Sequence, residues 1–545
     1  QEALSFHLSL IGIDSDIITC DFSTLQQQAF DPNSELRQFQ PDIVWNFSTV
    51  YDLSHLPARA EDSSAAENQI QKLKDLWQTL HSTSNLQVLQ NSFDLPAERT
   101  FGHFEGGMSF SKTQTVQLIN STLREQRHPG VALFDLDWVS SLYGKQSWFC
   151  KRHWYQAKYP FSVDATSLVA YHGARTIAAM LGRSQKCLVL DLDNTLWGGT
   201  LGDDGLAGLQ IGPDTAVGKA FLDFQYYLMG LKNRGILLAV CSKNEEALAR
   251  EVFLSHPEMI LKLEDFAAFQ VNWRNKAENL NEIASQLELS PEALVFVDDS
   301  PFERNLVRRL APKVMVPEMP DDIAEYIHTL DSLRYFETID FSDEDARRHQ
   351  LYSENRMRQS LRAETLDMAE YLKSLDMQCE VSGINSINSR RVTQLVNKSN
   401  QFNMTGQKVS QIVIDDLIEN PQHMGRVYRL RDRFGDNGLI SAAILRLDAD
   451  TMTIENWVMS CRVLLRGVEE FVHRDLIRLA KSKGIRRVVG LYVKGERNAL
   501  VAPLYRKLGF RLVSEASNPE KWELDVDLAV ADARSTFIKD FTPAI

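Results

Sequence analysis

The stretch C-L-V-L-D-L-D-N-T-L-W-G-G, from Cys187 to Gly199, predicts the fold of the middle of the chain. Its apolar first residues are typical of a strand that is buried on both faces of a parallel sheet. Asp191 and Asp193 stand where that strand would end, and a strand that ends between two such residues turns the second side chain aside. One carboxylate can then attack while the other handles a proton. Their mutual repulsion calls for a cation, for which Mg²⁺ is the natural choice.

Four further apolar runs follow before Pro320, each leading into a helix-forming stretch: I-L-L-A-V-C-S, A-F-Q-V-N, A-L-V-F-V-D-D and K-V-M-V-P. This alternation predicts an α/β domain with a doubly wound parallel sheet, which binds ligands outside the carboxyl ends of its strands. The polar residues at those ends suit a phosphate and a metal. They are Ser242, Lys243 and Asn244 after the second strand, Lys276 after the third, and Asp298 and Asp299 after the fourth.

The interval between Asp193 and Ser242 has room only for a glycine-rich flap, W-G-G-T-L-G-D-D-G, and one helix, Ala216–Asn233. No cap domain fits there or between Lys276 and Asp298. A site without a cap cannot enclose a small substrate by itself. We therefore expect either that another domain covers it or that the substrate arrives on a macromolecular carrier.

These strand-end elements, in this order, resemble the haloacid dehalogenase superfamily. The resemblance implies that Asp191 is the nucleophile, forming an aspartyl-phosphate, that Asp193 is the general acid and base, and that Ser242 and Lys276 bind the phosphate. It implies a Mg²⁺ site, in which we favour Asp299 for direct coordination and Asp298 for support or for bonding Lys276. The predicted metal residues are Asp191, Asp193, Asp298 and Asp299.

After Met377 the pattern changes to strand, helix, a run of strands, a long helix and more strand, which predicts a separate α+β domain. The passage from T-I-E-N-W-V-M-S-C-R-V-L-L-R-G through L-Y-R-K-L-G-F resembles a GNAT-type acyltransferase. In that fold a helix directs its backbone N–H groups at the pyrophosphate of coenzyme A. Here Val468 and Glu469 replace the second glycine of the loop, and a glutamate would repel a pyrophosphate, which speaks against ordinary acetyl-CoA use.

Cys461 lies where the strand gives way to that loop, the expected place for an acyl group. A thiol beside Arg462 and near a helix N-terminus can become nucleophilic, although a buried structural cysteine is the alternative. Cys241 is a rival, but its alternation points it into the core. Asn437, in R-D-R-F-G-D-N-G, and Arg462 are candidates for binding the substrate, and the polar string V-N-K-S-N-Q-F-N-M-T is a third. The alternative is that the Asn and Gly residues of these strings only form turns.

Residues 1 to 170 alternate helical patterns with four apolar runs: D-I-I-T-C-D-F, P-D-I-V-W-N-F, N-L-Q-V-L-Q-N and V-A-L-F-D-L-D. They predict a mostly parallel α/β domain that opens on a helix at Glu2–Ile11, with a polar connection at Ala58–Asn68. With W-Y-Q-A-K-Y-P-F-S it resembles an SGNH-hydrolase-like domain. It has no G-D-S nucleophile block, so we expect it to be non-catalytic or to serve for docking.

Together, D-L-D-N-T-L-W-G-G, C-S-K-N, V-D-D-S-P-x-E-R, N-Q-F-N, R-F-G-D-N-G and M-S-C-R-V resemble the FkbH-like family over roughly residues 185 to 515. The expected domains are an SGNH-like domain at 1–170, a capless phosphatase domain at 185–340, a helical connector at 341–376 and a GNAT-like domain at 377–530.

The resemblance implies a bifunctional glyceryltransferase/phosphatase of polyketide biosynthesis. Such an enzyme takes a 3-phosphoglyceryl unit from 1,3-bisphosphoglycerate onto a thiol, removes the phosphate and loads the three-carbon unit onto an acyl carrier protein. The alternative is a phosphatase of a small phosphorylated metabolite with an inert GNAT-like domain, and a non-catalytic scaffold is a third. A chain beginning at Gln1 fits a piece of a larger synthase, although trimming explains it equally well.

The net charge of −14 argues against a general nucleic-acid or anionic-membrane surface. We find no apolar run long enough to span a bilayer. The cysteines lie far apart and read as reduced thiols of a cytoplasmic protein. An acidic carrier would need a local basic patch, for which the candidates are Arg462, Arg466, Arg486 and Arg487.

Overall fold

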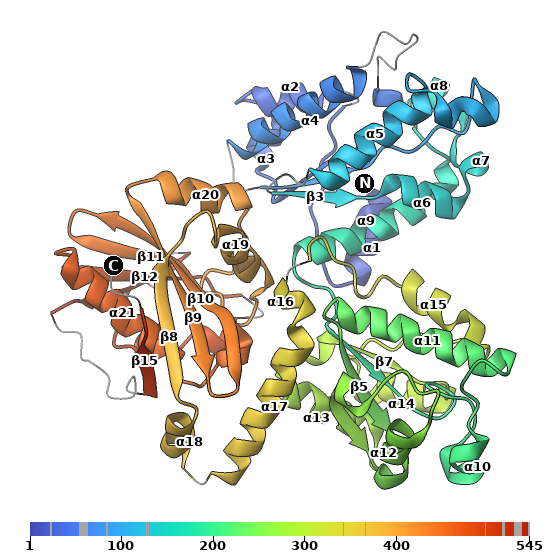
Figure 1. Ribbon diagram of the computed structural model, residues 1–545. Helices are drawn as coiled ribbons and strands as arrows, with labels where there is room; N and C mark the ends of the chain where they lie inside the picture. The colour runs from blue at the N-terminus through green and yellow to red at the C-terminus, as the bar shows by residue number, and fades with distance from the viewer. Residues whose placement is uncertain are drawn as a thin grey trace. The chain divides into compact units, whose positions relative to one another are not determined.

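The computed structural model describes residues 1–21, 24–53, 64–82, 86–126, 128, 130–341, 343–365, 367–495, 498–514, 518–527 and 537–542. The chain forms two compact units (Figure 1). The first comprises Gln1–Gly182, Ile384–Lys398 and Gln407–Gly425, and the second comprises Arg183–Gly383, Ser399–Gly406 and Arg426–Ile545. Within the described residues, no helix is long and apolar enough to cross a membrane.

A parallel sheet in the order β1-β2-β3 forms the centre of the first unit. Its strands are β1 (Ile43–Asn46), β2 (Gln87–Asn91) and β3 (Val131–Phe134), so three of the four expected strands form. Helices α4 and α5 pack Trp77 and Ile119 into the same core as Val88. The helices of this unit are α1 (Glu2–Leu10), α2 (Leu25–Phe30), α3 (Glu35–Phe39), α4 (Ala65–His81), α5 (Lys112–Glu125), α6 (Leu136–Tyr143), α7 (Lys145–Trp148), α8 (Lys151–Ala157), α9 (Thr166–Met180), α19 (Ser389–Lys398) and α20 (Gln411–Glu419).

The expected strand D-I-I-T-C-D-F does not form in residues 16–21, and Phe22 lies outside the described residues. A strand requires a neighbour for its backbone, and here the Ile17 carbonyl instead accepts a hydrogen bond from the side chain of Gln1. Most of the expected connection at Ala58–Asn68 also lies outside the described residues. The expected boundary at residue 170 falls inside α9, which packs against α1, α6 and β3 and so extends the first unit to Gly182.

The second unit contains a fully parallel sheet in the order β6-β5-β4-β7, as expected. The strands are β4 (Cys187–Leu190), β5 (Leu237–Ser242), β6 (Phe266–Val271) and β7 (Leu294–Val297). The expected strand K-V-M-V-P is reduced to one bridge between Met315 and Val295. Pro317, which follows, has no N–H group with which to continue the pairing.

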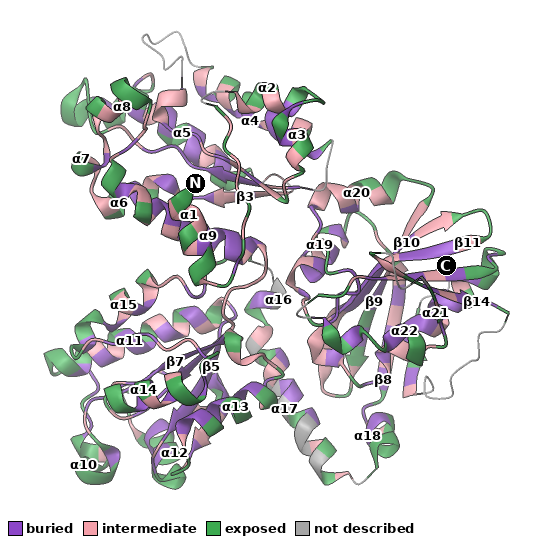
Figure 2. Ribbon diagram, turned by 180° about the vertical axis from the view of Figure 1, so that it is seen from behind, coloured by how far each residue is buried: buried purple, intermediate pink, exposed green. Residues whose placement is uncertain are grey.

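Alternate residues of these strands feed two apolar cores, one on each face of the sheet. Helices α11 (Ala216–Asn233), α12 (Glu246–Ser255) and α15 (Tyr326–Ser332) cover one face, and α13 (Lys276–Gln286) and α14 (Pro301–Leu310) cover the other. Figure 2 shows the strands as buried and the outer sides of the helices as exposed. Between Asp193 and Ser242, an interval described in full, the chain forms only the flap with α10 (Leu201–Gly208) and α11.

The connector consists of α16 (Asp343–Ala346), α17 (Arg348–Glu364) and α18 (Met368–Ser374). At the start of α17, Arg348 donates to the Gly235 carbonyl at 3.0 Å, just before β5. One turn later Tyr352 packs against the apolar core between the β4–β7 sheet and helices α13 and α14. Further along, Arg358 forms a bidentate ion pair with Asp432, both bonds 2.8 Å long. This helix therefore holds the domain of β4 to β7 at one end and the carboxy-terminal domain at the other.

The carboxy-terminal domain is built on a mixed sheet in the order β13-β14-β12-β11-β10-β9-β8-β15. β11 and β12 run parallel, whereas the neighbours on either side of this pair, β10 and β14, run antiparallel to it. The last strand lies beyond residue 530, so the domain extends past its expected end. The elements are β8 (Met377–Gly383), β9 (His423–Asp432), β10 (Gly435–Asp448), β11 (Thr451–Met459), α21 (Val468–Ser482), β12 (Arg487–Tyr492), α22 (Leu504–Lys507), β13 (Arg511–Ser514), β14 (Glu520–Asp525) and β15 (Ile538–Asp540).

We expect Arg358→Met to lower the free energy of unfolding of the second unit by about 3–5 kcal/mol, because it leaves the buried Asp432 carboxylate without its main partner. Urea unfolding followed by circular dichroism measures the change. Arg446→Met is the control, since Arg446 pairs with Asp448 and Glu455 at a side-chain exposure of 40% and should contribute no more than about 1 kcal/mol. Equal losses for the two variants would contradict the role given to Arg358.

Candidate active site

The acid residues meet at the carboxyl edge of the phosphatase sheet. Asp191 directly follows β4, the strand between β5 and β7, and its backbone N–H donates to the Val297 carbonyl at 3.0 Å. Asp298 and Asp299 directly follow β7. Because β4 and β7 are parallel neighbours in register, their ends bring the three aspartates together.

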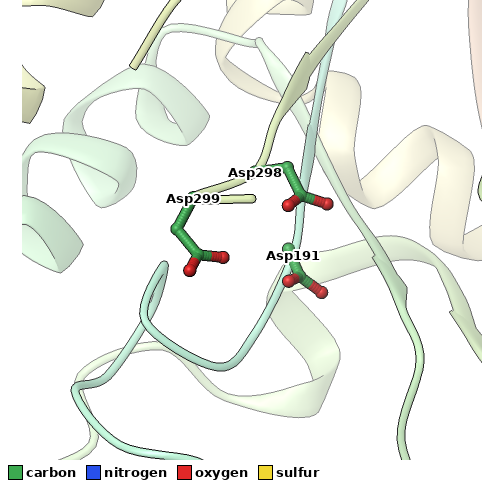
Figure 3. Close-up of side chains that lie close together, drawn as sticks. All are labelled: Asp191, Asp298 and Asp299. Atoms are coloured by element: carbon green, nitrogen blue, oxygen red, sulfur yellow. The ribbon is translucent and has the colours of Figure 1, made fainter. Parts of the chain in front are cut away.

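Asp191, Asp298 and Asp299 form a candidate metal centre. One carboxylate oxygen of each lies within 4.8 Å of the others, and Figure 3 shows the three side chains around a common space. Oδ1 of Asp191 is buried and has no hydrogen-bond partner among the described residues. A buried carboxylate oxygen that accepts no hydrogen bond, beside two further carboxylates, fits a hard divalent cation such as Mg²⁺. The carboxylate of Asp193 is not part of this group.

Lys276 balances this negative charge from the first residue of α13. Its Nζ lies 2.5 Å from Oδ2 of Asp298 and 3.0 Å from Oδ1 of Asp191, the second contact being too poorly aligned for a hydrogen bond. Burial alone would lower the pKa of Lys276, but the carboxylates of Asp191 and Asp298 raise it. The ammonium group is therefore held charged, beside the carboxylate expected to attack a phosphoryl group.

Burial also shapes the acidity of the carboxyl groups. It raises the pKa of Asp298 to about 7, with the neighbouring charge of Asp191 adding to the effect and Lys276 opposing it. Burial and the charge of Asp191 likewise raise the pKa of Asp299. Without a cation these groups therefore hold protons that ordinary carboxyl groups would have lost.

Asp193 is turned away from the metal centre, as expected for a residue beyond the end of the strand. Its Oδ1 accepts from the indole Nε1 of Trp197 at 2.8 Å and from the backbone N–H of Leu201 at 3.1 Å, and its Oδ2 accepts from Asn244 at 3.0 Å. Burial raises the pKa of Asp193, whereas these hydrogen bonds oppose the shift. Its place beside the site and its raised pKa suit a proton donor, while its side chain is unsuited to bind the same cation as Asp191.

The residues of C-S-K-N, Cys241 to Asn244, have different surroundings in the structure. Ser242 ends β5 at the same sheet edge and is 2% exposed. Asn244 is a positioning residue, because its amide holds Asp193. Lys243, expected to bind substrate, forms an ion pair of 2.7 Å with Glu303 at the start of α14. Cys241 points into the core, as expected, and burial raises the pKa of its thiol.

Two further residues hold the site and were not predicted. Arg304, buried in α14, donates to the carbonyls of Asp298 and Asp299 at 2.9 and 2.6 Å and so fixes the loop that carries both carboxylates. Trp197 ties the flap to Asp193. Both residues occur in strings that carry the family resemblance, V-D-D-S-P-x-E-R and W-G-G. The strings alone give no indication that these side chains bond to the acid loops.

Cys461 lies two residues beyond the end of β11, at the start of a short 3₁₀ turn, and is partly exposed. Neighbouring Arg462 donates from Nε to the Ser460 hydroxyl at 3.1 Å. The side chain of Tyr352 on α17 is close enough to Cys461 for the thiol to influence its pKa, which burial chiefly raises. The thiol therefore lies on the side of this domain that meets α17.

Asn437, expected to bind substrate, has its side chain engaged inside the domain. Asn437 is 2% exposed and its amide donates to Oδ2 of Asp432 at 3.2 Å. Arg466, expected on a carrier-binding patch, is also buried, donating to Asn355 at 3.0 Å with Asp432 at 3.6 Å. The sequence places both residues in polar loops. In the structure both side chains are buried because they contact the buried carboxylate of Asp432.

The N-terminus of α21 differs from an anion-binding site. Gly467 precedes the helix with φ of 78°, and the first turn carries Glu469 and Glu470. Burial raises the pKa of Glu469 to about 7. Acidic side chains at this end satisfy the helix dipole and add negative charge where a pyrophosphate would bind.

Comparison with known proteins finds matches to parts of the chain. A family model described as FkbH, N-terminal domain, matches residues 7–177. The solved N-terminal part of a Bacteroides fragilis protein, which contains a phosphatase domain and is complexed with Mg, is 34% identical with a TM-score of 0.58, and the match covers 62% of this chain and 90% of that chain. The ribosomal-protein-S18-alanine N-acetyltransferase of Escherichia coli is 14% identical with a TM-score of 0.22, over 29% of this chain and 97% of that one. No curated protein matches the chain.

We expect Mg²⁺ affinity to fall as the pH is lowered below 7, because the raised pKa values of Asp298 and Asp299 let protons compete with the cation. The loss can reach about tenfold per pH unit for each proton displaced. Isothermal titration calorimetry at pH 6 and pH 8 measures it, with Asp265→Asn as a control buried aspartate of the same domain. Equal dissociation constants at the two pH values would rule out this competition.

Proposed function

The chain belongs to the FkbH family, and from this premise we propose that it is a bifunctional glyceryltransferase/phosphatase. It takes a 3-phosphoglyceryl unit from 1,3-bisphosphoglycerate onto Cys461, removes the phosphate at a Mg²⁺-dependent aspartate site, and loads the glyceryl or a derived three-carbon unit onto an acyl carrier protein in polyketide biosynthesis. The observation that carries the proposal is the pairing of a complete, capless acid site around Asp191 with a partly exposed cysteine at the end of β11.

The first step uses an acyl phosphate, which is already activated. The Cys461 sulfur forms a C–S bond with the carbonyl carbon, and the C–O bond to the 1-phosphate breaks. The phosphate leaves with the electron pair of that bond, and the thiol proton passes to solvent. A thioester of the phosphoglyceryl unit results, and no reductant, oxidant or nucleotide is consumed.

The second step removes the remaining phosphate at the aspartate site. A carboxylate oxygen of Asp191 attacks phosphorus, the P–O bond to the glyceryl oxygen breaks, and Asp193 gives that oxygen its proton. Water then hydrolyses the aspartyl-phosphate, with Asp193 taking up a proton. Lys276 neutralises the phosphoryl group throughout. A Mg²⁺ ion held by Asp191, Asp298 and Asp299 would supply charge stabilisation of the phosphoryl oxygens.

The third step passes the acyl unit to the carrier. The pantetheine sulfur attacks the thioester carbonyl, a new C–S bond forms, and the bond to Cys461 breaks. The absence of a cap in the fully described interval from Asp193 to Ser242 suits a substrate attached to a carrier. The basic residues proposed for docking are Arg462, Arg486 and Arg487, of which Arg487 pairs with Asp450 and Glu523.

Intact-mass measurement after incubation with 1,3-bisphosphoglycerate and Mg²⁺ tests the proposal. We expect a glyceryl adduct on the wild type, a phosphoglyceryl adduct on Asp191→Asn, and no adduct on Cys461→Ala. The reason is that Asp191 acts only in removing the phosphate, whereas Cys461 holds the unit. Cys379→Ala is a matched control, since Cys379 is a buried cysteine of the same domain and should leave the adducts unchanged.

An unchanged adduct on Cys461→Ala would show that another group holds the acyl unit. If no variant forms an adduct while the wild type still hydrolyses small phosphate esters and Asp191→Asn does not, the protein is a phosphatase with an inert carboxy-terminal domain.

A further inference from the structure

Two large aromatic residues are exposed at the carboxyl edge of the β4–β7 sheet. Trp273, two residues beyond β6, is 73% exposed, and Phe302, in the first turn of α14, is 70% exposed. β6 and β7 are the outer strands of this sheet, and β4 and β5, which lead to Asp191 and Ser242, lie between them. The two aromatic residues therefore stand on opposite sides of the acid site.

Trp273 lies on a turn that the site itself holds in place. The backbone N–H of Asn272 donates to the carbonyl of the last residue of β5 at 3.1 Å, and Lys276, which contacts the acid site, follows three residues later. Oδ1 of Asn272 accepts from the backbone N–H of Arg274 at 3.0 Å and from the side chain of Asn279 at 2.9 Å. These bonds close an Asx turn around Trp273, so a fixed backbone presents the exposed indole.

Phe302 is held in a similar way by the loop of the metal centre. Two residues before it, the backbone N–H of Ser300 donates to Oδ1 of Asp298 at 2.9 Å. Two residues after it, Arg304 donates to the carbonyls of Asp298 and Asp299. The neighbours of Phe302 thus serve the acid site, whereas its own ring adds little to the core because it is exposed. Rings placed in this way are available for contact with a substrate.

The basic side chains beside these rings are paired with carboxylates. Lys243 pairs with Glu303 at 2.7 Å, and Arg274 pairs with Glu282 at 2.7 Å. The third, Lys276, contacts the aspartates of the acid site. A substrate with a free carboxylate beside its phosphate would have to break one of these pairs, and the aspartates would repel it as a like charge. This edge therefore favours a substrate whose charge is confined to its phosphate.

We propose that Trp273 and Phe302 form an aromatic rim that contacts the substrate beyond its phosphate, and that the site selects the phosphoglyceryl unit as a neutral thioester over the free acid. The inference rests on the proposed function, whose first step converts the carboxyl group into a thioester. In the fully described interval from Asp193 to Ser242 there is no cap, so recognition beyond the phosphate falls to the rim. The uncharged arm of a thioester can lie against the two rings. Removal of the phosphate therefore follows acyl transfer.

Phosphate release from three pre-formed substrates, measured with Mg²⁺ at pH 7, tests the selectivity of the wild type. The substrates are the 3-phosphoglyceryl thioester of pantetheine, the methyl ester of 3-phosphoglycerate, and 3-phosphoglycerate itself. We expect kcat/KM to be at least about tenfold higher for the thioester than for the free acid, with the methyl ester between them. An equal or higher value for the free acid would overturn the inference. None of these substrates needs Cys461, so a failure of acyl transfer would be seen separately in the adduct experiment.

The double variant Trp273→Ala/Phe302→Ala tests the rim. We expect its KM for the thioester to rise about tenfold with kcat retained, and its KM for the methyl ester, which has no arm, to change less than about twofold. Tyr226→Ala is the matched control and should change neither value, because Tyr226, halfway along α11, is an aromatic residue of the same domain that is 56% exposed.

Two results of this second experiment would contradict the inference. An equal rise in KM for the thioester and the methyl ester would show that the substitutions act through Lys276 and the metal loop. An unchanged KM for the thioester would show that the rings do not contact the arm.

Discussion

The acid site depends on the ion pairs that the buried ammonium group of Lys276 forms with Asp191 and Asp298. Three aspartates lie close together at the ends of β4 and β7, and two of them contact this one cation. Buried carboxylates without a counter-charge would repel one another and take up protons. Lys276 can occupy its position because Asn275 caps α13 and starts the helix there. A helix cap thus helps to set the charge balance of the site.

Asp432 plays a comparable part in the carboxy-terminal domain. Its carboxylate gathers Arg358 from the connector, Arg466 from the loop before α21, and Asn437 from β10. A buried carboxylate satisfied by several donors gives a defined arrangement, and the loss of one donor is costly. The polar residues that read as a second substrate site therefore form the joint between α17 and this domain. Through Arg466 they hold the loop that runs from Cys461 to α21.

The β4–β7 sheet and the carboxy-terminal sheet differ in whether the chain covers their unpaired strand ends and edges. The phosphatase sheet leaves the carboxyl ends of its strands free, in an interval where the chain forms only a flap and α10 besides α11. The carboxy-terminal sheet opens between β11 and β12, but its own segment Phe402–Thr405 closes the opening. An edge that is free can accept a ligand, whereas an edge that is already paired cannot. The two sheets therefore differ in how much of their strand edges is left unpaired within the described residues.

Local sequence was sufficient to predict much of the fold and of the acid site of this protein. Runs of apolar residues predicted β4 to β7, because a strand buried on both faces must be apolar throughout, and the carboxylates at their ends predicted the meeting of Asp191, Asp298 and Asp299. Two expected strands did not form in full: residues 16–21 pair with no strand, and K-V-M-V-P keeps one bridge at Met315. Pairing decides whether a short apolar run becomes a strand, and pairing is not local.

By itself, the sequence determined the order of the elements, the parallel sheet and the identity of the acidic residues, since these follow from periodicity and from where strands end. Only the tertiary structure decided which polar residues are buried in the joint between α17 and the carboxy-terminal domain, as Asn437 and Arg466 show. It also decided that Met404, distant in sequence from β11, pairs with it. The physical reason is that burial and backbone pairing depend on segments that come together only when the chain is folded.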